Sequence, residues 1–406
     1  MSNVVSKKLG DSITLKRGYD LPEKNRKLGT YPVISSAGIS GYHNEYKVDG
    51  KGVVTGRYGT LGEMYYVEGK YWPHNTALYV QDFKGNDPKY IYYLLKCIGR
   101  IRTSDKSTVP GVNRNELHEM LVPTIADRVG QVACREVLEV IDKKIELNNR
   151  INAELESMAK TLYDYWFVQF DFPDENGKPY KSSGGKMVYN DTLKREIPEG
   201  WLERTLGDLI KLGRGVTYGK QDVVSKSTLE SEGVLRATNV TGNIVDNDDL
   251  VYVSKSVVDD SQKIHSFDTL IVMSSGSKEH VGKNGIYYFD EPLGFGAFCS
   301  KITPHKEALF FVNTFLQTDW FKAYIKKQCL GTSINNLTTK HILNCNVVVP
   351  NSEVLRLFEE TVEPLYNKIA INTLENKRLK ELRDFLLPML MNGQVTVNPS
   401  AELKNA

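Results

Sequence analysis

The stretch "KKLGDSITLKRG" at residues 7–18 occurs a second time, as "RTLGDLIKLGRG" at residues 204–215. Aligned without a gap, the two copies share seven of twelve residues. The identical pairs are Leu9/Leu206, Gly10/Gly207, Asp11/Asp208, Ile13/Ile210, Leu15/Leu212, Arg17/Arg214 and Gly18/Gly215. Self-similarity at a long period indicates that one structural unit is repeated. The chain is therefore predicted to hold two copies of one type of domain, each opened by this element.

The rest of the two halves matches in the same order. Gly- and Tyr-rich alternating segments follow each opening element. Next comes an apolar run closed by proline, "ELHEMLVP" up to Pro123 and "HILNCNVVVP" up to Pro350. Each half then ends in a long heptad helix, expected over about residues 125–167 and 354–391. An internal duplication accounts for all of these elements.

The apolar residues of both expected helices follow the a/d spacing of a coiled coil. The predicted seam holds Ile151, Leu155, Met158, Leu162 and Tyr165 in the first helix and Leu379, Leu382, Leu386 and Met389 in the second. An offset of 224 residues places Asn148 on Asn372, as it places Leu155 on Leu379. An Asn buried on the seam would fix register and partner, whereas an Asn on the surface would not, and the sequence leaves both readings open. The two helices are predicted to pair antiparallel.

These observations predict an α+β fold in which two globular domains of mixed α/β type, with twisted sheets, are joined by the two helices and related by a pseudo-two-fold axis. Antiparallel pairing would put the globular domains at opposite ends of the helices. Short β-branched and aromatic runs predict the strands, and the segments "PKYIYYLLKCIGRI" and "ALFFVNTFLQTDWFKAYIKKQ" predict a helical run in each half. The expected division is 1–123, first domain; 124–170, first helix; 171–197, extended connector; 198–350, second domain; 351–394, second helix; and 395–406, tail.

Bulk composition excludes several classes of protein. With 406 residues the chain is long enough for two to three domains. No run of residues has the length and apolar character of a membrane span or a signal peptide, so a cytoplasmic location is expected. The five cysteines are odd in number and widely spaced, which argues for isolated buried thiols and against a disulfide framework or a zinc cluster.

The formal net charge is only +2, so charge alone does not indicate a nucleic-acid partner. Residues 84–114 are locally basic, and Tyr90, Tyr92 and Tyr93 are interleaved with the lysines and arginines. Such a segment can bind phosphate, but a solvated helix face has the same composition. The sequence does not decide between these two interpretations.

A search for catalytic motifs finds none. The chain has no adjacent prolines, which a methyltransferase acting on amino nitrogens would need in its Asp/Asn-Pro-Pro-aromatic loop. The segments beginning at Gly213 and Gly276 have one residue too many for a phosphate-binding loop, and Gln221 or Asn284 stands where the hydroxyl residue belongs. The histidines show no metal-ligand spacing. We therefore expect no catalytic residue, no metal and no cofactor bound by this chain.

Several Gly-bounded segments instead carry side chains suited to contact with DNA. Arginine, lysine and asparagine can bond base edges and phosphates, and serine hydroxyls can bond phosphate oxygens. Each of these residues alone is also common in ordinary turns. The candidate DNA-binding residues are Ser35, Ser36, Tyr42, His43, Arg57, Tyr58, Lys106, Arg114, Arg214, Lys220, Arg236, Asn239, Ser274, Ser275, Ser277, Lys278, His280 and Lys283.

The ordered set of motifs resembles the specificity (S) subunit of Type I restriction-modification systems, the HsdS family. The set comprises the LGD start, "YPVISSAGISGYH", "VVTGRYGTLG", the apolar run to proline, the long helix, "ENGKPYKSSGGKMVYN", "IPEGW" and a second such series ending in "LLPMLMNGQVTV". The resemblance covers essentially the whole chain. One departure is "TIADRVGQV" after Pro123, where members of the family have a Glu-Gln pair entering the helix.

The resemblance implies a function as well as a fold. In this family each globular part is a target-recognition domain that reads half of a bipartite, asymmetric DNA site. The two helices bind two methyltransferase (M) subunits, and restriction/translocase (R) subunits join for cleavage. S-adenosylmethionine, ATP and magnesium are then expected on those partners and not on this chain, which would not be an enzyme on its own. The seam residues would serve assembly.

Two alternatives remain at this stage. A coiled-coil scaffold presenting two protein-binding domains would explain the near-neutral charge and the long seam, but it would select no DNA sequence. An enzyme complete in itself, a nuclease or a methyltransferase, would show activity with magnesium or a methyl donor. Selection of DNA sequences distinguishes a recognition subunit from the scaffold, and activity of the isolated chain with magnesium or a methyl donor distinguishes it from the enzyme.

Overall fold

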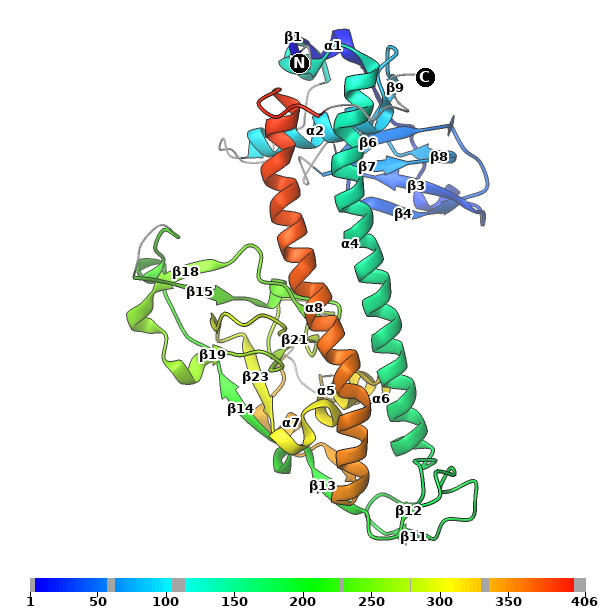
Figure 1. The fold of residues 1–406 in the computed structure, drawn as a ribbon, viewed down its shortest axis with the longest axis vertical. Helices are drawn as coiled ribbons and strands as arrows, with labels where there is room; N and C mark the ends of the chain where they lie inside the picture. Colours follow the sequence, from blue (N-terminus) through cyan, green and yellow to red (C-terminus); the bar gives the residue numbers. More distant parts are fainter. Residues whose placement is uncertain are drawn as a thin grey trace. The chain divides into compact units, whose positions relative to one another are not determined.

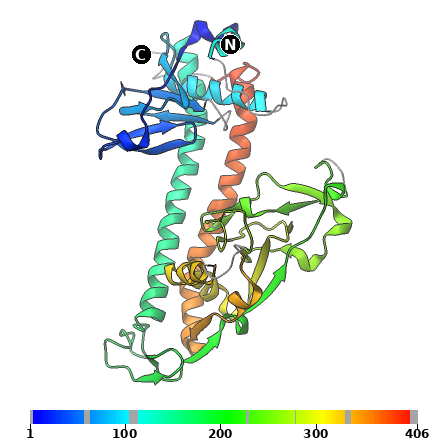
Figure 2. The same cartoon turned by 180° about the vertical axis from the view of Figure 1, so that it is seen from behind.

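The computed structural model describes residues 4–56, 63–103, 114–226, 230–277, 279–329 and 336–397. The chain divides into two compact units. Unit 1 comprises Met1–Glu146 and Lys377–Ala406, and unit 2 comprises Leu147–Asn376. Two views of the chain are given in Figures 1 and 2. Each long helix contributes residues to both units, so the compact units do not coincide with the domain boundaries expected from the sequence.

Unit 1 contains two four-stranded sheets and a separate strand pair. The sheets have the orders β2-β9-β6-β7 and β4-β3-β8-β5, and β1 pairs with β10. The elements are β1 (Val4–Lys8), α1 (Leu9–Ser12), β2 (Thr14–Arg17), β3 (Tyr31–Ser35), β4 (Gly38–His43), β5 (Val48–Asp49), β6 (Gly52–Gly56), β7 (Met64–Val67), β8 (Lys70–Pro73), β9 (Ala77–Asp82), α2 (Pro88–Thr103), α3 (Arg114–Glu119) and β10 (Leu121–Ile125). Helix α2 packs on β6 and β7 and places Tyr90 and Tyr93 in the core of this unit.

Unit 2 contains a six-stranded sheet of order β14-β23-β20-β21-β17-β16, a four-stranded sheet of order β18-β15-β22-β19, and the pair β13-β24. The elements are β13 (Leu202–Thr205), β14 (Ile210–Arg214), β15 (Ser231–Leu235), β16 (Val240–Thr241), β17 (Ile244–Val245), β18 (Val251–Ser254), β19 (Lys263–Ile264), β20 (Thr269–Val272), β21 (Asn284–Ile286), β22 (Leu293–Phe295), β23 (Cys299–Pro304), α5 (Leu309–Gln317), α6 (Asp319–Cys329), α7 (Thr339–Leu343) and β24 (Asn346–Val349).

The strand order of unit 2 repeats that of unit 1. β14, β23, β20 and β21 pair antiparallel in the same succession as β2, β9, β6 and β7. In the second sheet, β15 lies between an antiparallel β18 and a parallel β22, as β3 lies between β4 and β8. The hairpin β16-β17, which joins β21, is an addition in unit 2.

The repeated opening element serves the same structural purpose in both units. Leu9 and Leu206 are completely buried in their respective cores. Gly18 and Gly215 each follow a strand at a point where the backbone of another loop approaches closely. A Cβ at Gly18 would collide with the carbonyl oxygen of His74, and one at Gly215 with the carbonyl oxygen of Gly296. Glycine is required at both places because any side chain would push the loops apart.

The helical structure expected over 308–328 is confirmed, but it is divided into α5 and α6 at Thr318. The backbone of Thr318 is extended, with φ −64° and ψ 149°. Its hydroxyl oxygen accepts a hydrogen bond of 3.2 Å from the N–H of Phe321, which caps the first turn of α6. Threonine favours such caps since its side chain competes with the helix for backbone groups.

The segment expected to be an extended connector has more structure than its composition indicates. β11 (Met187–Asn190) and β12 (Arg195–Pro198) form an antiparallel hairpin. Phe172 stacks on Tyr180 with ring centroids 4.6 Å apart and lies 4.9 Å from the ring of Trp201. These aromatic residues join the segment to the main hydrophobic core of unit 2, and hydrophobic periodicity does not detect them because they are not regularly spaced.

The two long helices are α4 (Arg128–Tyr163), which continues as a π-helical turn Asp164–Val168, and α8 (Ser352–Met391). Within each unit they lie side by side (Figures 1 and 2). In unit 2 Asn148 is bonded to Asn376, and Asn372 to Asn152, so residue numbers rise along one helix as they fall along the other. In unit 1 the ion pair of Asp142 with Arg383, at 2.8 Å, follows the same antiparallel sense.

The predicted seam is only partly correct. Leu155 and Leu162 are half-buried against the core of unit 2, and Leu386 against that of unit 1. The prediction is wrong for Met158, which is 52% exposed, and for Leu382, which is 45% exposed. Their neighbours Ala159 and Arg383 occupy the seam instead. Ile151 is half-buried, as Leu155 is, and its neighbour Asn152 is buried. Tyr165 is 37% exposed, and its neighbour Trp166 is buried. Leu379 and Met389 are half-buried.

The asparagines lie on the seam and are buried. Asn148 and Asn372 are each 1% exposed, which settles the alternative that the sequence left open. Asn148 Nδ2 donates to Asn376 Oδ1 at 3.0 Å, and Asn372 Nδ2 donates to Asn152 Oδ1 at 2.8 Å. With the offset of 224, each of these bonds is the equivalent of the other. The middle of the helix pair is therefore polar and held by reciprocal hydrogen bonds.

Two further expectations concern cysteines and membranes. All five cysteines are free; four are buried and Cys329 is half-buried, which confirms isolated thiols. None of the helices in the described ranges is both long and apolar enough to span a membrane.

Candidate nucleic-acid interface

Three strand ends meet at one edge of the large sheet in unit 2. Arg214, the last residue of β14, lies opposite Ser300 of β23, and Val272, the last residue of β20, lies opposite Cys299. The loop after β20 and the loop before β23 therefore start from the same edge. The backbone N–H groups of Met273 and Ser274 both donate to the carbonyl oxygen of Phe298, at 2.8 and 3.2 Å, which ties the two loops together.

This edge brings together most of the residues predicted in the second half of the chain. Arg214, Ser277, His280 and Lys283 are exposed, and Ser274 and Ser275 are half-buried. Lys283 Nζ lies 3.0 Å from His280 Nδ1, so the amino group and the ring are held next to each other. Lys278 lies outside the described residues. We call Arg214, Ser274, Ser275, Ser277, His280, Lys283 and Phe298 the recognition edge of unit 2.

Phe298 was missed by the sequence reasoning. Its side chain is 69% exposed although it is aromatic, and it lies in the loop directly before β23. An exposed aromatic ring beside basic and hydroxyl side chains can stack on a base or wedge between base steps. Its signal in the sequence is a phenylalanine that ends the Gly-rich segment "LGFGAF" at residues 293–298.

The same edge exists in unit 1. Arg17 ends β2 opposite Leu78 of β9, and Gly56 ends β6 opposite Ala77. Arg17 Nε donates to the carbonyl oxygen of Asn75 at 3.3 Å, which holds the arginine against the loop before β9. Arg17 was not among the candidate residues predicted from the sequence. It could have been found from the Arg-Gly pair that both copies of the opening repeat share. Arg57 and Tyr58 follow β6 and lie outside the described residues.

Of the other predicted residues of unit 1, Ser36 lies beside the loop before β9, since its N–H donates to Thr76 Oγ1 at 3.4 Å. Tyr42 is 54% exposed on β4, and Ser35 and Ser36 are half-buried at the turn before it. His43 is only 4% exposed, and its Nδ1 lies 3.0 Å from the N–H of Lys27, so it is a structural residue and its prediction as a DNA contact is wrong. Arg114 is exposed at the start of α3, and Lys106 lies outside the described residues.

Arg236 and Asn239 also have structural roles. Asn239 is 4% exposed; its Oδ1 accepts from the N–H of Arg236 at 2.8 Å, and its Nδ2 donates to the carbonyl oxygen of Asp248. Arg236 pairs with Asp249, Nη2 to Oδ2, at 2.8 Å. The prediction is therefore wrong for Asn239, whose amide is used within the fold. Lys220 is exposed in the turn after β14.

The basic segment of unit 1 is partly explained by packing. Lys89 Nζ lies 4.0 Å from the ring centroid of Tyr66, and Lys96 Nζ lies 5.5 Å from that of Tyr92. Tyr90 and Tyr93 are fully buried. These contacts favour the interpretation of a helix face with cation–π contacts over that of a phosphate-binding patch.

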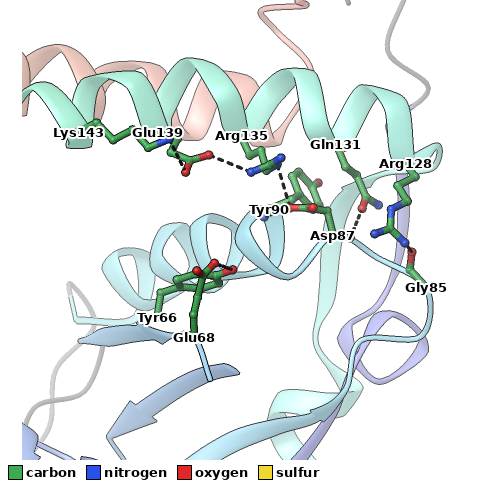
Figure 3. Close-up of polar contacts among 10 residues, drawn as sticks. All are labelled: Tyr66, Glu68, Gly85, Asp87, Tyr90, Arg128, Gln131, Arg135, Glu139 and Lys143. Carbon is green, nitrogen blue, oxygen red and sulfur yellow. Dashed lines mark hydrogen bonds and ion pairs between the residues drawn. The ribbon is translucent and has the colours of Figure 1, made fainter. Parts of the chain in front are cut away.

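A polar joint attaches the globular part of unit 1 to α4 (Figure 3). Asp87 caps α2, because its Oδ1 accepts from the N–H of Tyr90 at 2.9 Å. On α4, Arg135 Nε lies 3.3 Å from Asp87 Oδ1, and Gln131 Oε1 accepts from the N–H of Asp87 at 2.9 Å. Arg135 also pairs with Glu139, so the carboxylates and the guanidinium form one network.

Unit 2 has a joint at the equivalent position with the opposite charge. Glu359 of α8 is 224 residues after Arg135. Its Oε2 and Oε1 accept from the N–H groups of Phe310 and Phe311 at 2.9 and 2.7 Å. Helix α5 has Ala308 at its N-cap and no side-chain cap of its own, so the long helix supplies the carboxylate. Burial raises the pKa of Glu359 to about 7, although both N–H groups oppose the shift.

The described residues offer no catalytic arrangement. No group of three His, Cys, Asp or Glu side chains within the described ranges lies close enough to hold a metal ion. Glu68 and Lys70 have the Glu-x-Lys spacing found in nuclease sites, but both make other contacts. Glu68 accepts a hydrogen bond of 3.0 Å from the hydroxyl of Tyr66, and Lys70 lies over the ring of Tyr46. The arrangement is suited to contacts with a surface and to holding domains on helices.

Comparison with known proteins points the same way. The model of the family described as "Type I restriction modification DNA specificity domain" matches residues 1–157 and 198–382. The EcoKI specificity subunit of Escherichia coli K12 is 30% identical over 206 residues, which are 50% of this chain and 44% of the relative. The chain thus aligns with less than half of that relative. The MjaIX specificity subunit of Methanocaldococcus jannaschii is 26% identical over 78% of this chain and 72% of its own length.

A solved structure shares the fold. The S subunit of a Type-I restriction-modification system from M. genitalium has a TM-score of 0.54 and 17% identity, and the alignment covers 96% of each chain. At this identity the likeness concerns the mixed α/β fold alone. The family match, in contrast, extends over both units and most of the sequence. The chain belongs to the family of Type I restriction-modification DNA specificity proteins.

Proposed function

We propose that the chain is the non-catalytic subunit that recognises DNA sequence in a Type I restriction-modification complex. In this proposal each recognition edge reads one half of a bipartite site. The half-sites would differ, because the two edges share the arginine but differ in the loops around it. Their centres would lie on the order of one helical turn apart, about 10 base pairs.

The observation that carries the proposal is the repeated sheet edge with an arginine at the same strand end. Arg17 and Arg214 are both exposed, and each lies beside a loop that starts from the neighbouring strand. An arginine can donate two hydrogen bonds to guanine O6 and N7, the commonest specific contact in the major groove. Serine hydroxyls and lysines next to it would bond phosphates and set the position on the duplex.

We infer further that the chain is an internal duplication with pseudo-two-fold symmetry, whose long helices form an antiparallel coiled coil. Matching strand orders and the reciprocal asparagine bonds support this inference. Two similar surfaces on one chain would suit two copies of a partner, so we propose two methyltransferase subunits, joined by restriction/translocase subunits. S-adenosylmethionine, ATP and magnesium would then be held by these partners.

The proposal is tested by selecting duplexes from a random pool with the chain alone and with its methyltransferase subunit. We expect the complex to enrich a split motif with two defined blocks and an undefined spacer. We expect the chain alone to show weaker preference, because phosphate contacts supply much of the affinity without sequence information. Enrichment of no motif by the complex would instead favour the coiled-coil scaffold.

A further inference from the structure

A cavity of about 610 Å³ lies in unit 2 next to the recognition edge. Its wall is formed by three parts of the chain: the turn between β16 and β17 with Asn243, the end of the loop after β20 with Lys283, and α6. The volume is in the range of cavities that hold small organic ligands. Neither the candidate residues nor the family match assigns a role to α6.

The cavity is lined by several basic side chains and by some apolar surface. Lys322, Ile325, Lys326 and Cys329 of α6 line it together, because spacings of three and four residues place them on one face of the helix. Lys283 adds a third amino group from the loop. Among the described lining residues these three lysines face a single carboxylate, so the site has an excess of positive charge.

That carboxylate belongs to Glu279, which lies on the same loop as Lys283. It is exposed, and solvent therefore screens much of its charge. Val281, which is half-buried, contributes apolar surface to the lining, whereas Ile325 is only 2% exposed and packs into the core of the unit. A ligand that carries both a phosphate and an uncharged organic part would match these two surfaces.

The amino group of Lys322 is positioned by a chain of hydrogen bonds. Lys322 Nζ donates to Asn243 Oδ1 at 3.4 Å, and Asn243 Nδ2 donates to Glu156 Oε2 of α4 at 2.8 Å. Burial raises the pKa of Glu156, while the bond from Asn243 and the charge of Lys322 oppose the shift. The lysine is thus part of an ordered polar chain that reaches from the cavity to the long helix.

The loop after β20 packs closely against α6 at the wall of the cavity. Gly282 has a φ of +82°, and a Cβ at this position would collide with the side chain of Ile325. The loop can therefore approach α6 only because residue 282 is glycine. Asn284 also lines the cavity. Its Oδ1 accepts a hydrogen bond of 2.7 Å from Gln317 Nε2, which joins the end of the loop to α5.

We propose that this cavity binds one nucleotide unit through its phosphate, with Lys322 and Lys326 as the phosphate ligands and the sugar or base against Val281. Lysine amino groups act as point charges that suit phosphate oxygens. Resting on the proposed function, the nucleotide is a unit of the DNA strand that passes the recognition edge. A free mononucleotide has the same chemistry, and the experiment below separates the two sources.

The test compares three forms of the full chain in complex with its methyltransferase subunit: wild type, the double variant Lys322→Ala/Lys326→Ala, and Lys327→Ala. Lys327 is exposed on α6 but does not line the cavity, which makes it a matched control. Binding to duplexes is measured between 50 and 300 mM salt. For each phosphate contact that the double variant loses, we expect the plot of log binding constant against log salt concentration to become less steep by about 0.9. We also expect binding at 0.1 M salt to weaken roughly tenfold per contact, equally for all DNA sequences.

A second readout is acetylation of lysines with a limiting reagent, followed by mass spectrometry. With duplex DNA present, we expect Lys322 and Lys326 to be protected and Lys327 to react as before. Protection by duplex alone identifies the DNA strand as the source of the phosphate. Protection by AMP in the absence of DNA also supports the cavity and identifies a free nucleotide.

An unchanged salt slope in the double variant, with no protection by duplex or AMP, would overturn this inference. The wild-type selection experiment then still decides the proposed function on its own. If the wild-type complex selects no sequence but the lysines are protected, the proposed function fails and the cavity remains a phosphate site. The two failures are therefore distinguishable.

Discussion

Glu359 shows how one residue can couple the attachment of a domain to pH. Its carboxyl accepts from two backbone N–H groups at the start of α5, yet burial raises its pKa from 4.5 to about 7. Folding therefore favours the protonated form. The stability that this group contributes is fully present below about pH 4.5 and is lost as the pH rises toward 7.

We predict that Glu359→Gln removes this pH dependence, because an amide has the shape of the protonated acid but does not titrate. The stability of wild type relative to Glu359→Gln should fall between pH 5 and pH 7.5, by up to about 3 kcal/mol. Thermal unfolding of both proteins across this range measures the difference. A constant difference at every pH would show that the carboxyl does not titrate there.

Arg135, the counterpart of Glu359, is matched to a different helix start. Asp87 already caps α2, so the long helix supplies a cation in unit 1, whereas in unit 2 the uncapped α5 receives the carboxyl oxygens of Glu359 as hydrogen-bond acceptors. The two joints occupy equivalent positions in the repeat, but one needs a hydrogen-bond donor on the long helix and the other needs an acceptor. Sequence reading could not find them, since an arginine and a glutamate at equivalent positions look like unrelated surface residues.

We predict that Arg135→Glu destabilises unit 1 by roughly 2–3 kcal/mol, because it sets a carboxylate beside the buried Asp87. Lys143→Glu is the control: its side chain is 69% exposed, and its pair with Glu139 should contribute under about 1 kcal/mol. Denaturant unfolding measures both changes. Equal effects of the two substitutions would contradict a specific role for Arg135.

At the scale of elements, the helix pair was predictable but its exact stripe was not. Leu155 and Leu162 fit two adjacent stripes, and the apolar Ile151 and Met158 favoured the wrong one. The buried seam runs through Asn152 and Ala159. Because Asn152 is polar and Ala159 is small, neither stands out in a hydrophobicity pattern. A seam that is polar at its centre cannot be located from apolar periodicity alone.

The central asparagines give a prediction for the paired helices. Asn148 and Asn376 share a hydrogen bond, and so do Asn372 and Asn152. Double-mutant cycles with alanine should give a coupling of about 1 kcal/mol for each pair, and the two values should agree. Chemical denaturation of the single and double variants provides the data. Coupling in one pair but not the other would contradict an equivalent role in the two halves of the repeat.

At the scale of the whole molecule, the repeat predicts two similar mixed α/β parts, and the two units have matching strand orders. Such similarity can be predicted because hydrophobic pattern and turn residues are local signals. The position of the contact residues was harder to predict. His43 and Asn239 have the composition of contact residues but are buried, while Arg17 and Phe298 became candidates only when the strand ends were seen to meet. Whether a side chain is exposed, and which strand ends lie together, depends on the tertiary structure. Neither can be inferred from the type of a single residue.

The central claim is that each recognition edge reads one half of a split DNA site. The most direct test is selection from a random duplex pool by the complex carrying Arg214→Ala and Phe298→Ala, compared with one carrying Arg17→Ala. We predict that the first complex loses definition in one block of the motif and the second in the other block, each leaving the remaining block unchanged. If both variants degrade the same block, or both blocks equally, the two units do not read separate half-sites.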